Sequence, residues 1–298
     1  DSNLYAVASR SLEKAHAFAS QHKVEKAYGS YTDLMNDPKV DIIYIATPHN
    51  SHAELSIQCM EAGRAVLCEK AFALNRIQAE QMVAASKKNN VFLMEAFWTR
   101  FNPSIKKILS MVKEGAIGEV NYIQADFTFY KDAPVDGRLL NMDLAGGALL
   151  DIGVYPIFLA YLIMGKPRHI VASSIKHETG ADLQTAIRFD YPQGYANLFC
   201  SMQAQTDMQA KICGPKGAIL IPDRWHQPNG FTLMQNYGKE HFDLPKLGLG
   251  YSYEIQEAQV CLQEGKIESD LWTHQNSIDL ISICDEIREL INLKYPSE

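Results

Sequence analysis

A Glu-Lys pair directly follows an apolar run that is typical of a buried strand. Residues 65–68 are Ala-Val-Leu-Cys, and Glu69 and Lys70 come next. A strand buried on both faces lies inside a parallel sheet, and such sheets bind ligands just beyond the carboxyl ends of their strands. A partly buried lysine can have its pKa lowered far enough to exchange protons near neutral pH. The pair is therefore a candidate for proton transfer, and the alternative is an ion pair that simply ends a strand.

An aspartate and a tyrosine form a second candidate pair. Asp151 and Tyr155 are four residues apart in an apolar, glycine-containing stretch that is predicted to be helical as far as Met164. This spacing places both side chains on one face of the helix. Polar groups in such surroundings cost free energy unless they are satisfied, which favours a functional site. The alternative is that Tyr155 packs in the core with its hydroxyl bonded to Asp151.

Strands and helices alternate over the first hundred residues. Each apolar segment with strand character is followed by an amphipathic segment with helix character. The predicted strands are 4–10, 40–46, 65–69 and 91–95, and the predicted helices are 11–22, 32–35, 53–62 and 75–89. This order predicts an α/β domain with a Rossmann-type, doubly wound parallel sheet and right-handed crossovers.

Strands dominate the second part of the chain. They are predicted at 120–130, 169–176, 183–190, 196–205, 209–214, 218–222 and 231–236, with helices at 103–114, 252–264 and 273–292. We expect an α+β domain with a large, mostly antiparallel open sheet at residues 99–298. A Rossmann domain should occupy residues 1–98, and the C-terminal helix could pack back on it. Helices on one face of the large sheet leave the other face to be covered, so a homodimer through this sheet is predicted.

A nucleotide cofactor is the ligand that this architecture favours. The Gly-x-Gly-x-x-Gly turn that cradles a pyrophosphate after the first strand is absent from the 298 residues. If residues 4–8 form the second strand, the first strand and its glycine loop lie upstream of Asp1. We therefore expect about 25 to 30 further residues, the length of one strand, turn and helix, to precede this sequence.

Two polar residues at the end of the first predicted strand bear on the choice of cofactor. Ser9 and Arg10 stand where dinucleotide-binding domains contact the adenosine ribose. A carboxylate there suits a free 2′-hydroxyl, whereas a guanidinium and a hydroxyl suit a 2′-phosphate. NADP is therefore expected and NAD is less favoured, unless Arg10 is a solvated surface residue.

Composition and charge narrow the class of protein. The net charge of -7 and the lack of a Lys/Arg cluster argue against nucleic acid as a partner. No apolar run approaches the ~20 residues that span a bilayer, and no signal pattern opens the chain. The expectation is a cytoplasmic protein with a small-molecule substrate and reduced, buried cysteines. His49 and His52 are the one close histidine pair, and no further ligand set joins them, so no metal site is expected.

The motifs in this order resemble the glucose–fructose oxidoreductase/inositol dehydrogenase (Gfo/Idh/MocA) family. They are Thr-Pro at 47–48, Glu-Lys at 69–70 and Gly-Gly-Ala-Leu-Leu-Asp-Ile-Gly at 146–153. Segments 27–31, 93–96, 98–101 and 177–180 are similar to the dimeric dihydrodiol dehydrogenases of that family, which also act as NADP-dependent D-xylose dehydrogenases. The resemblance spans nearly the whole chain. It implies hydride transfer between NADP and a secondary alcohol or hemiacetal of a sugar, a polyol or a trans-dihydrodiol.

The resemblance also implies catalytic roles. The family's lysine falls on Lys70 and the aspartate of its second motif on Asp151, while Tyr155 stands where most members have histidine and the dihydrodiol dehydrogenases have tyrosine. Tyr155 would take the substrate proton, and Lys70 would hold the substrate oxygen and lower the pKa of Tyr155. Asp151 would orient Lys70 or a substrate hydroxyl. Alternatively, Lys70 transfers the proton and Tyr155 positions the substrate. Ala71 replaces the usual proline, so the turn at Lys70 is less constrained.

Further residues are expected to bind the cofactor. They are Ser9 and Arg10 at the 2′-phosphate, Thr47, Pro48 and Asn50 along the ribose and nicotinamide, and Glu69 at the nicotinamide ribose. His52 either supports the cofactor or belongs to the start of the next helix. Trp98 and Arg100 would close over cofactor and substrate, unless Trp98 only packs between the domains.

Two other functions fit the same fold, since fold does not determine function. One is a non-catalytic regulator that binds NADP or a sugar. The other is a related oxidoreductase with a different substrate, such as a biliverdin-reductase-like or an amino-sugar enzyme. The substrate itself depends on loops such as 131–138 and 223–230, whose geometry the sequence does not give.

Overall fold

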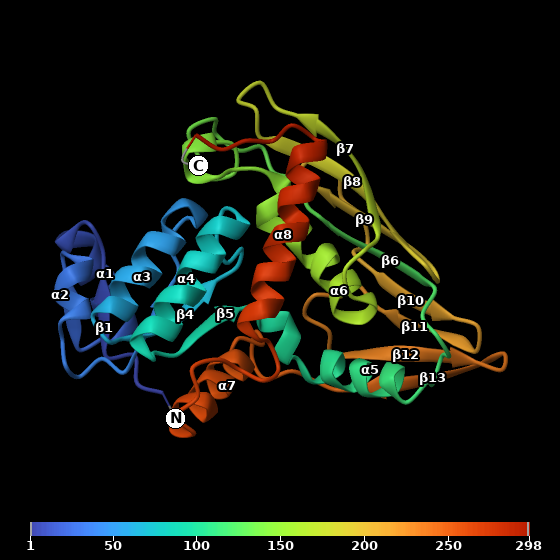
Figure 1. Cartoon of the computed structure of the whole chain (residues 1–298), viewed down its shortest axis with the longest axis horizontal. Coiled ribbons are helices and arrows are strands. Elements are labelled where there is room, and N and C mark those ends of the chain that lie inside the picture. Colours follow the sequence, from blue (N-terminus) through green and yellow to red (C-terminus); the bar gives the residue numbers. More distant parts are fainter. Residues whose placement is uncertain (1, 297) are drawn as a thin grey trace.

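Five short parallel strands form the N-terminal part of the computed structural model, which describes residues 2–296 and 298 (Figure 1). β1 (Ala6–Ala8) pairs with β2 (Lys26–Tyr28), and β3 (Ile42–Ile45), β4 (Ala65–Glu69) and β5 (Leu93–Ala96) form a second sheet in that order. The connecting helices are α1 (Leu12–His22), α2 (Tyr31–Met35), α3 (His52–Glu61) and α4 (Arg76–Asn89). This alternation confirms the predicted Rossmann-type arrangement.

Strands β1 and β3 do not pair with each other in the part of the chain that the structure describes. In the strand order of a doubly wound sheet, one further strand lies between these two. Ile42 and Ile43 of β3 keep partial exposure, whereas the apolar residues of β4 are buried.

Capping residues explain where the helices of this part begin and end. The side chain of Ser11 accepts a hydrogen bond from the N–H of Lys14 at the start of α1, and Asn75 caps α4 in the same way. Beyond α3 the chain reverses at Gly63, whose φ of 74° favours glycine. The turns after β3 and β4 therefore lie outside the helices, at the carboxyl edge of the sheet.

An eight-stranded sheet forms the C-terminal part. Its order is β13-β12-β11-β10-β6-β9-β8-β7, and all neighbours are antiparallel except β6 and β9. The strands are β6 (Tyr122–Thr128), β7 (His169–Lys176), β8 (Asp182–Tyr191), β9 (Gly194–Ser201), β10 (Ala210–Gly214), β11 (Gly217–Ile221), β12 (Gly230–Gln235) and β13 (Gly238–Asp243). The predicted large, mostly antiparallel sheet is confirmed. β13 was not predicted, because its residues are polar and largely exposed and show no apolar alternation.

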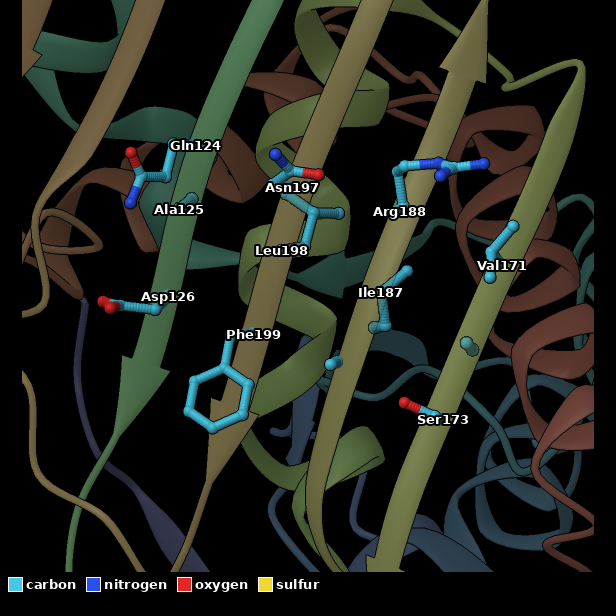
Figure 2. A pocket seen from close by; sticks show the side chains of 12 residues that line it. Gln124, Ala125, Asp126, Val171, Ser173, Ile187, Arg188, Asn197, Leu198 and Phe199 are labelled. Atoms are coloured by element: carbon cyan, nitrogen blue, oxygen red, sulfur yellow. The ribbon is translucent and has the colours of Figure 1, made fainter.

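Helices cover one face of this sheet and leave the other open. α6 (Val154–Met164) contacts β6 and β9, and α8 (His274–Leu290) contacts β7 and β5. Both helices lie between the parallel strands of the N-terminal part and the eight-stranded sheet (Figure 1). α5 (Pro103–Lys113) and α7 (Ser252–Gln263) complete the helices. Side chains such as Asp126, Arg188 and Phe199 lie on the opposite side of the sheet from α6 (Figure 2).

The segment Met142–Met164 is long and apolar enough, by length and composition alone, to cross a membrane. The expectation that no apolar run approaches this length is therefore corrected. However, 72% of its most apolar 18-residue stretch is buried inside the structure. α6, which makes up its second half, packs against both β6 and α8, as a core helix does.

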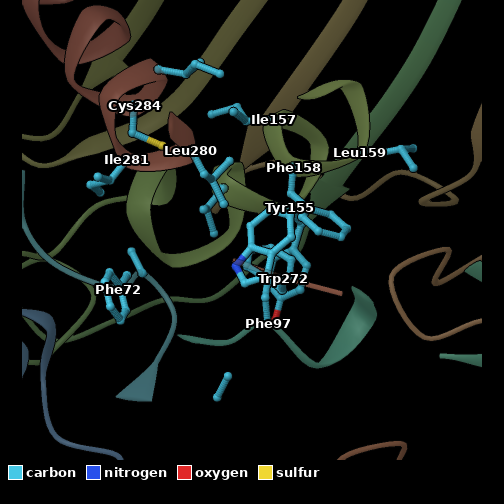
Figure 3. Close-up of a cluster of buried hydrophobic side chains, with 14 of the residues drawn as sticks. Phe72, Phe97, Tyr155, Ile157, Phe158, Leu159, Trp272, Leu280, Ile281 and Cys284 are labelled. Atoms are coloured by element: carbon cyan, nitrogen blue, oxygen red, sulfur yellow. The ribbon is translucent and has the colours of Figure 1, made fainter. Parts of the chain in front are cut away.

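Aromatic side chains fill the junction between the N-terminal and the C-terminal part of the chain (Figure 3). The ring of Phe97, after β5, stacks on Phe158 of α6 with centroids 4.1 Å apart. Trp272, before α8, lies 5.2 Å from Phe158 and 5.9 Å from Phe97 between ring centroids. All three side chains are almost fully buried, so they join both parts of the chain in one hydrophobic core.

A buried carboxyl group links α8 to β5. Glu95 is 2% exposed, and its Oε2 accepts hydrogen bonds from Nε1 of Trp272 at 2.9 Å and from Oγ of Ser277 at 2.7 Å. Burial raises the pKa of Glu95 from 4.5 to about 7, although these hydrogen bonds oppose the rise. Between these two pH values the folded protein keeps a proton on Glu95 that the unfolded chain has lost.

We predict that Glu95→Gln removes part of the pH dependence of stability. Because the pKa of Glu95 is raised on folding, its stabilisation is full below about pH 4.5 and is lost as the pH rises through about 7. The shift corresponds to roughly 3 kcal/mol. The amide keeps an acceptor oxygen but does not titrate. Thermal unfolding should therefore favour the variant increasingly as the pH rises over this range, whereas parallel Tm curves for the two proteins would contradict the assignment.

Candidate active site

Lys70 reaches across from the parallel sheet to the first turn of the apolar helix. Its Nζ donates a hydrogen bond to the backbone carbonyl of Asp151 at 2.7 Å and lies 3.7 Å from Oδ1 of the same residue. Both side chains are largely buried. The two candidate pairs identified in the sequence are therefore brought together at the carboxyl end of β4.

The backbone geometry at Asp151 explains why its carbonyl is free to accept this bond. Residues Leu149–Gly153 form a π turn, designated η4, in which hydrogen bonds join residues five apart, and α6 follows directly. Five residues after Asp151 stands Pro156, which has no N–H to donate. The predicted continuous α-helix is corrected accordingly, because Asp151 lies in the π turn and Tyr155 in the first turn of α6.

Arg138 is a member of this cluster that sequence reasoning missed. Its guanidinium donates two hydrogen bonds to the carboxylate of Asp151, at 2.8 and 3.3 Å. Burial alone would raise the pKa of Asp151, but the positive charges of Lys70 and Arg138 outweigh it and hold that pKa below its usual value. Asp151 is therefore ionised at neutral pH. Arg138 belongs to a polar loop, and no spacing rule connects that loop to the helix.

Tyr155 is buried beside Lys70, with its hydroxyl bonded to a tryptophan. The indole Nε1 of Trp98 donates to the Tyr155 oxygen at 2.7 Å, and Nζ of Lys70 lies 5.3 Å from the centre of the Tyr155 ring. Burial raises the pKa of Tyr155 well above its usual value, and the Trp98 bond only partly opposes this. The hydroxyl is therefore neutral, and the expected lowering of this pKa by Lys70 stays a prediction.

Aromatic rings pack around Tyr155. The ring of Trp98 stacks on that of Tyr251 with centroids 4.6 Å apart, and the ring centroids of Phe127 and Tyr155 are 5.1 Å apart. His226 stacks on Phe127 at 4.2 Å and meets Tyr155 edge-on at 5.5 Å. Sequence reasoning did not identify His226. The one available signal was its place after Trp225 in an otherwise polar loop.

The residues expected at the cofactor lie at the carboxyl ends of β1, β3 and β4. Arg10 is exposed after β1, and Ser9 accepts a hydrogen bond from the N–H of Ser11. Thr47 and Pro48 follow β3, and Asn50 donates to the carbonyl of Asp143. Glu69 accepts hydrogen bonds from the Tyr44 hydroxyl and from the N–H of Lys70. The polar groups at these positions fit the ribose and nicotinamide ends of a dinucleotide. The glycine turn for the pyrophosphate is not part of these 298 residues.

His52 supports the loops that hold these residues. It is the first residue of α3 and is fully buried, with Nδ1 2.9 Å from the Ala71 carbonyl and Nε2 2.9 Å from the Thr47 carbonyl. Burial lowers the pKa of His52, so the neutral ring donates to one carbonyl at a time. The contact joins the turn after β3 to the turn after β4.

Arg100 contacts the segment before α8. Its Nε donates to the carbonyl of Leu271 at 2.9 Å, and the expected contact of Arg100 with cofactor and substrate stays a prediction. This bond holds the segment before α8 next to η2 (Trp98–Phe101).

In the described part of the chain, no three His, Cys, Asp or Glu side chains are grouped so as to hold a metal ion.

Two models of known families match most of the chain. Residues 1–97 match the oxidoreductase family with an NAD-binding Rossmann fold, and residues 105–220 match the GFO/IDH/MocA C-terminal domain. The first region contains the parallel strands, and the second begins in α5 and extends to β11.

Curated relatives and solved structures agree with this match. The chain is 37% identical to a trans-1,2-dihydrobenzene-1,2-diol dehydrogenase of Xenopus tropicalis, over 99% of this chain and 92% of the relative. It is 34% identical to the enzyme of that name from Homo sapiens, over 98% and 90%. A 3-ketoreductase from Actinomadura kijaniata, solved with NADP and TDP-benzene, superposes with a TM-score of 0.87 at 26% identity, covering 97% of this chain and 90% of that one. The chain therefore belongs to the Gfo/Idh/MocA family of NAD(P)-dependent oxidoreductases.

Proposed function

We propose that this protein transfers a hydride between NADP and a secondary alcohol or hemiacetal of a sugar, a polyol or a trans-dihydrodiol. The observation that supports this most directly is the meeting of Lys70, Asp151 and Tyr155 at the carboxyl end of β4. The names of the curated relatives, dehydrogenases of a trans-dihydrodiol at 34–37% identity, support the trans-dihydrodiol substrate class.

Tyr155 is the residue that would move the substrate proton. The cofactor supplies the hydride acceptor or donor, and the protein moves the proton of the hydroxyl group. Because Trp98 donates to the Tyr155 oxygen, the tyrosine proton is free to be donated to a carbonyl oxygen in reduction. This donation leaves a phenolate, which both Trp98 and the nearby Lys70 ammonium would stabilise. In oxidation the same phenolate oxygen accepts the proton of the substrate hydroxyl and becomes a phenol again.

Lys70 would hold the reacting oxygen of the substrate. An ammonium group has three N–H donors, and the bond to the Asp151 carbonyl uses one of them. Asp151, held by Arg138, would keep the ammonium in place. The alternative, in which Lys70 itself transfers the proton, needs the same contacts, so both versions depend on Lys70.

NADP is the cofactor that we propose. Arg10 stands exposed at the end of β1, where its guanidinium can pair with a 2′-phosphate. The 3-ketoreductase that superposes on this chain was solved with NADP. Thr47, Pro48, Asn50 and Glu69 would complete the contacts to the nicotinamide half.

The domain boundaries and the cellular location are also part of the proposal. We assign residues 1–98 to cofactor binding and residues 99–298 to substrate binding and dimerisation, with α8 returning to contact α4 and β5. A cytoplasmic location is supported by the burial of α6 and by six free cysteines, none of them exposed.

A homodimer through the open face of the large sheet is the partner that we propose. This face includes the exposed apolar side chains Val171 and Tyr195, and the half-buried ring of Phe199 lies on it (Figure 2). Soluble monomers seldom expose large contiguous apolar patches, so apolar side chains grouped on an open sheet face favour a covering partner.

We predict that Lys70→Met abolishes turnover while cofactor still binds. Loss of the ammonium removes the group that holds the substrate oxygen, so kcat should fall by roughly 10³-fold or more. Steady-state kinetics measures kcat, and fluorescence titration measures NADP binding. Lys107→Met, an exposed lysine of α5, serves as the matched control. Turnover within a few fold of the unmodified protein would overturn both versions of the mechanism.

We predict that Phe199→Glu converts the protein from dimer to monomer. A carboxylate in the proposed interface would have to be buried without a partner. Analytical ultracentrifugation should give twice the 33.4 kDa chain mass for the unmodified protein and the single mass for the variant. Tyr237→Glu, on the fully exposed turn between β12 and β13, should remain dimeric. A monomer in all three samples rules out the interface.

A further inference from the structure

His226 lies in the candidate site without a role in the proton transfer described above. It belongs to the loop before β12 and is 6% exposed. Its ring stacks on Phe127 and meets the rings of Tyr155 and Trp98 edge-on, with centroids 5.5 and 5.9 Å away. The imidazole is therefore packed in place against the ring of Tyr155.

The nitrogens of His226 have no hydrogen-bond partner within the described residues. Nδ1 is buried and unpaired, and the residue's one such contact is made by its backbone carbonyl, which accepts from Oγ1 of Thr99. Buried polar side chains in folded proteins are usually paired, so an unpaired one inside a binding site points to a ligand group or a water molecule. His226 thus has unused hydrogen-bonding capacity in the substrate region.

The charge state of His226 limits what this ligand group can be. Burial lowers the pKa of His226 to about 3, and the cations Arg224, Lys246 and Lys70 lower it further. The neutral imidazole has one N–H donor and one acceptor nitrogen. A carboxylate or phosphate could use the donor alone and would face the lone pair of the acceptor. A hydroxyl group can pair with either nitrogen.

We infer that His226 binds the hydroxyl group on the carbon next to the reacting one, so that the site selects vicinal diols. This inference rests on the proposed function, since it places the reacting hydroxyl at Tyr155. The Tyr155 and His226 rings lie close enough for one small ring-shaped ligand to contact both. Phe127 and Trp98 would pack against the apolar face of such a ligand.

The test compares the binding of a vicinal diol and a simple alcohol. The full-length protein is loaded with NADPH, which forms no product with an alcohol, and is titrated calorimetrically with trans-cyclohexane-1,2-diol and with cyclohexanol. His226→Phe keeps the ring that stacks on Phe127 and removes both nitrogens. His16→Phe, at an exposed histidine of α1, is the matched control. Thermal unfolding confirms that each variant is folded.

The unmodified protein and His16→Phe should bind the diol roughly tenfold more tightly than cyclohexanol, and His226→Phe should bind the two equally. The inference is overturned if the unmodified protein does not discriminate, if it binds neither compound, or if His226→Phe keeps the discrimination. Reduction of NADP by the diol is measured separately. Discrimination that depends on His226, without any NADP reduction, would support the diol site and contradict the proposed function.

Discussion

The hydrogen bond from Lys70 to the Asp151 carbonyl is the contact on which the site depends. It joins the end of a strand in one sheet to the start of a helix that packs on the other. Its donor is positioned by a buried strand, and its acceptor is available because the π turn meets Pro156. The buried aromatic rings and Glu95 at the junction hold the two parts in the arrangement that this bond needs.

The ionisable side chains discussed around Lys70 are either paired with another charge or kept neutral by burial. Asp151 is ionised but shared with Arg138, and burial keeps the His49 and His226 side chains neutral by lowering the pKa of each to about 3. Burial also keeps the Tyr155 hydroxyl protonated. An ammonium beside a neutral phenol favours proton donation to a carbonyl oxygen, because it stabilises the phenolate that this donation leaves. In the reverse direction that phenolate accepts the proton of the alcohol.

Much of this site follows from local sequence patterns, and the remainder depends on contacts that those patterns do not contain. The apolar run before Glu69 and Lys70 predicted a central strand, and the polar residues Asp151 and Tyr155 marked the apolar helix. Their roles came from the resemblance to a family. Arg138 and His226 were missed because each reaches the site from an irregular loop. The π turn was also missed, since it depends on a proline whose effect appears only in the helix hydrogen-bond pattern.

Two residues of the site make contacts that local sequence patterns do not contain. The Nε of Arg100 has an acceptor in the backbone of the segment before α8. Burial beside rings such as Trp98 and Phe127 raises the pKa of Tyr155. Both contacts depend on residues far apart in the sequence.

Steady-state reduction of NADP and of NAD by the full-length protein tests the central claim most directly, with D-xylose and trans-cyclohexane-1,2-diol as substrates. The account predicts turnover of at least one of these alcohols, with NADP strongly preferred over NAD. Tight binding of NADP without turnover of either substrate would contradict it and would favour a regulator built on the same fold.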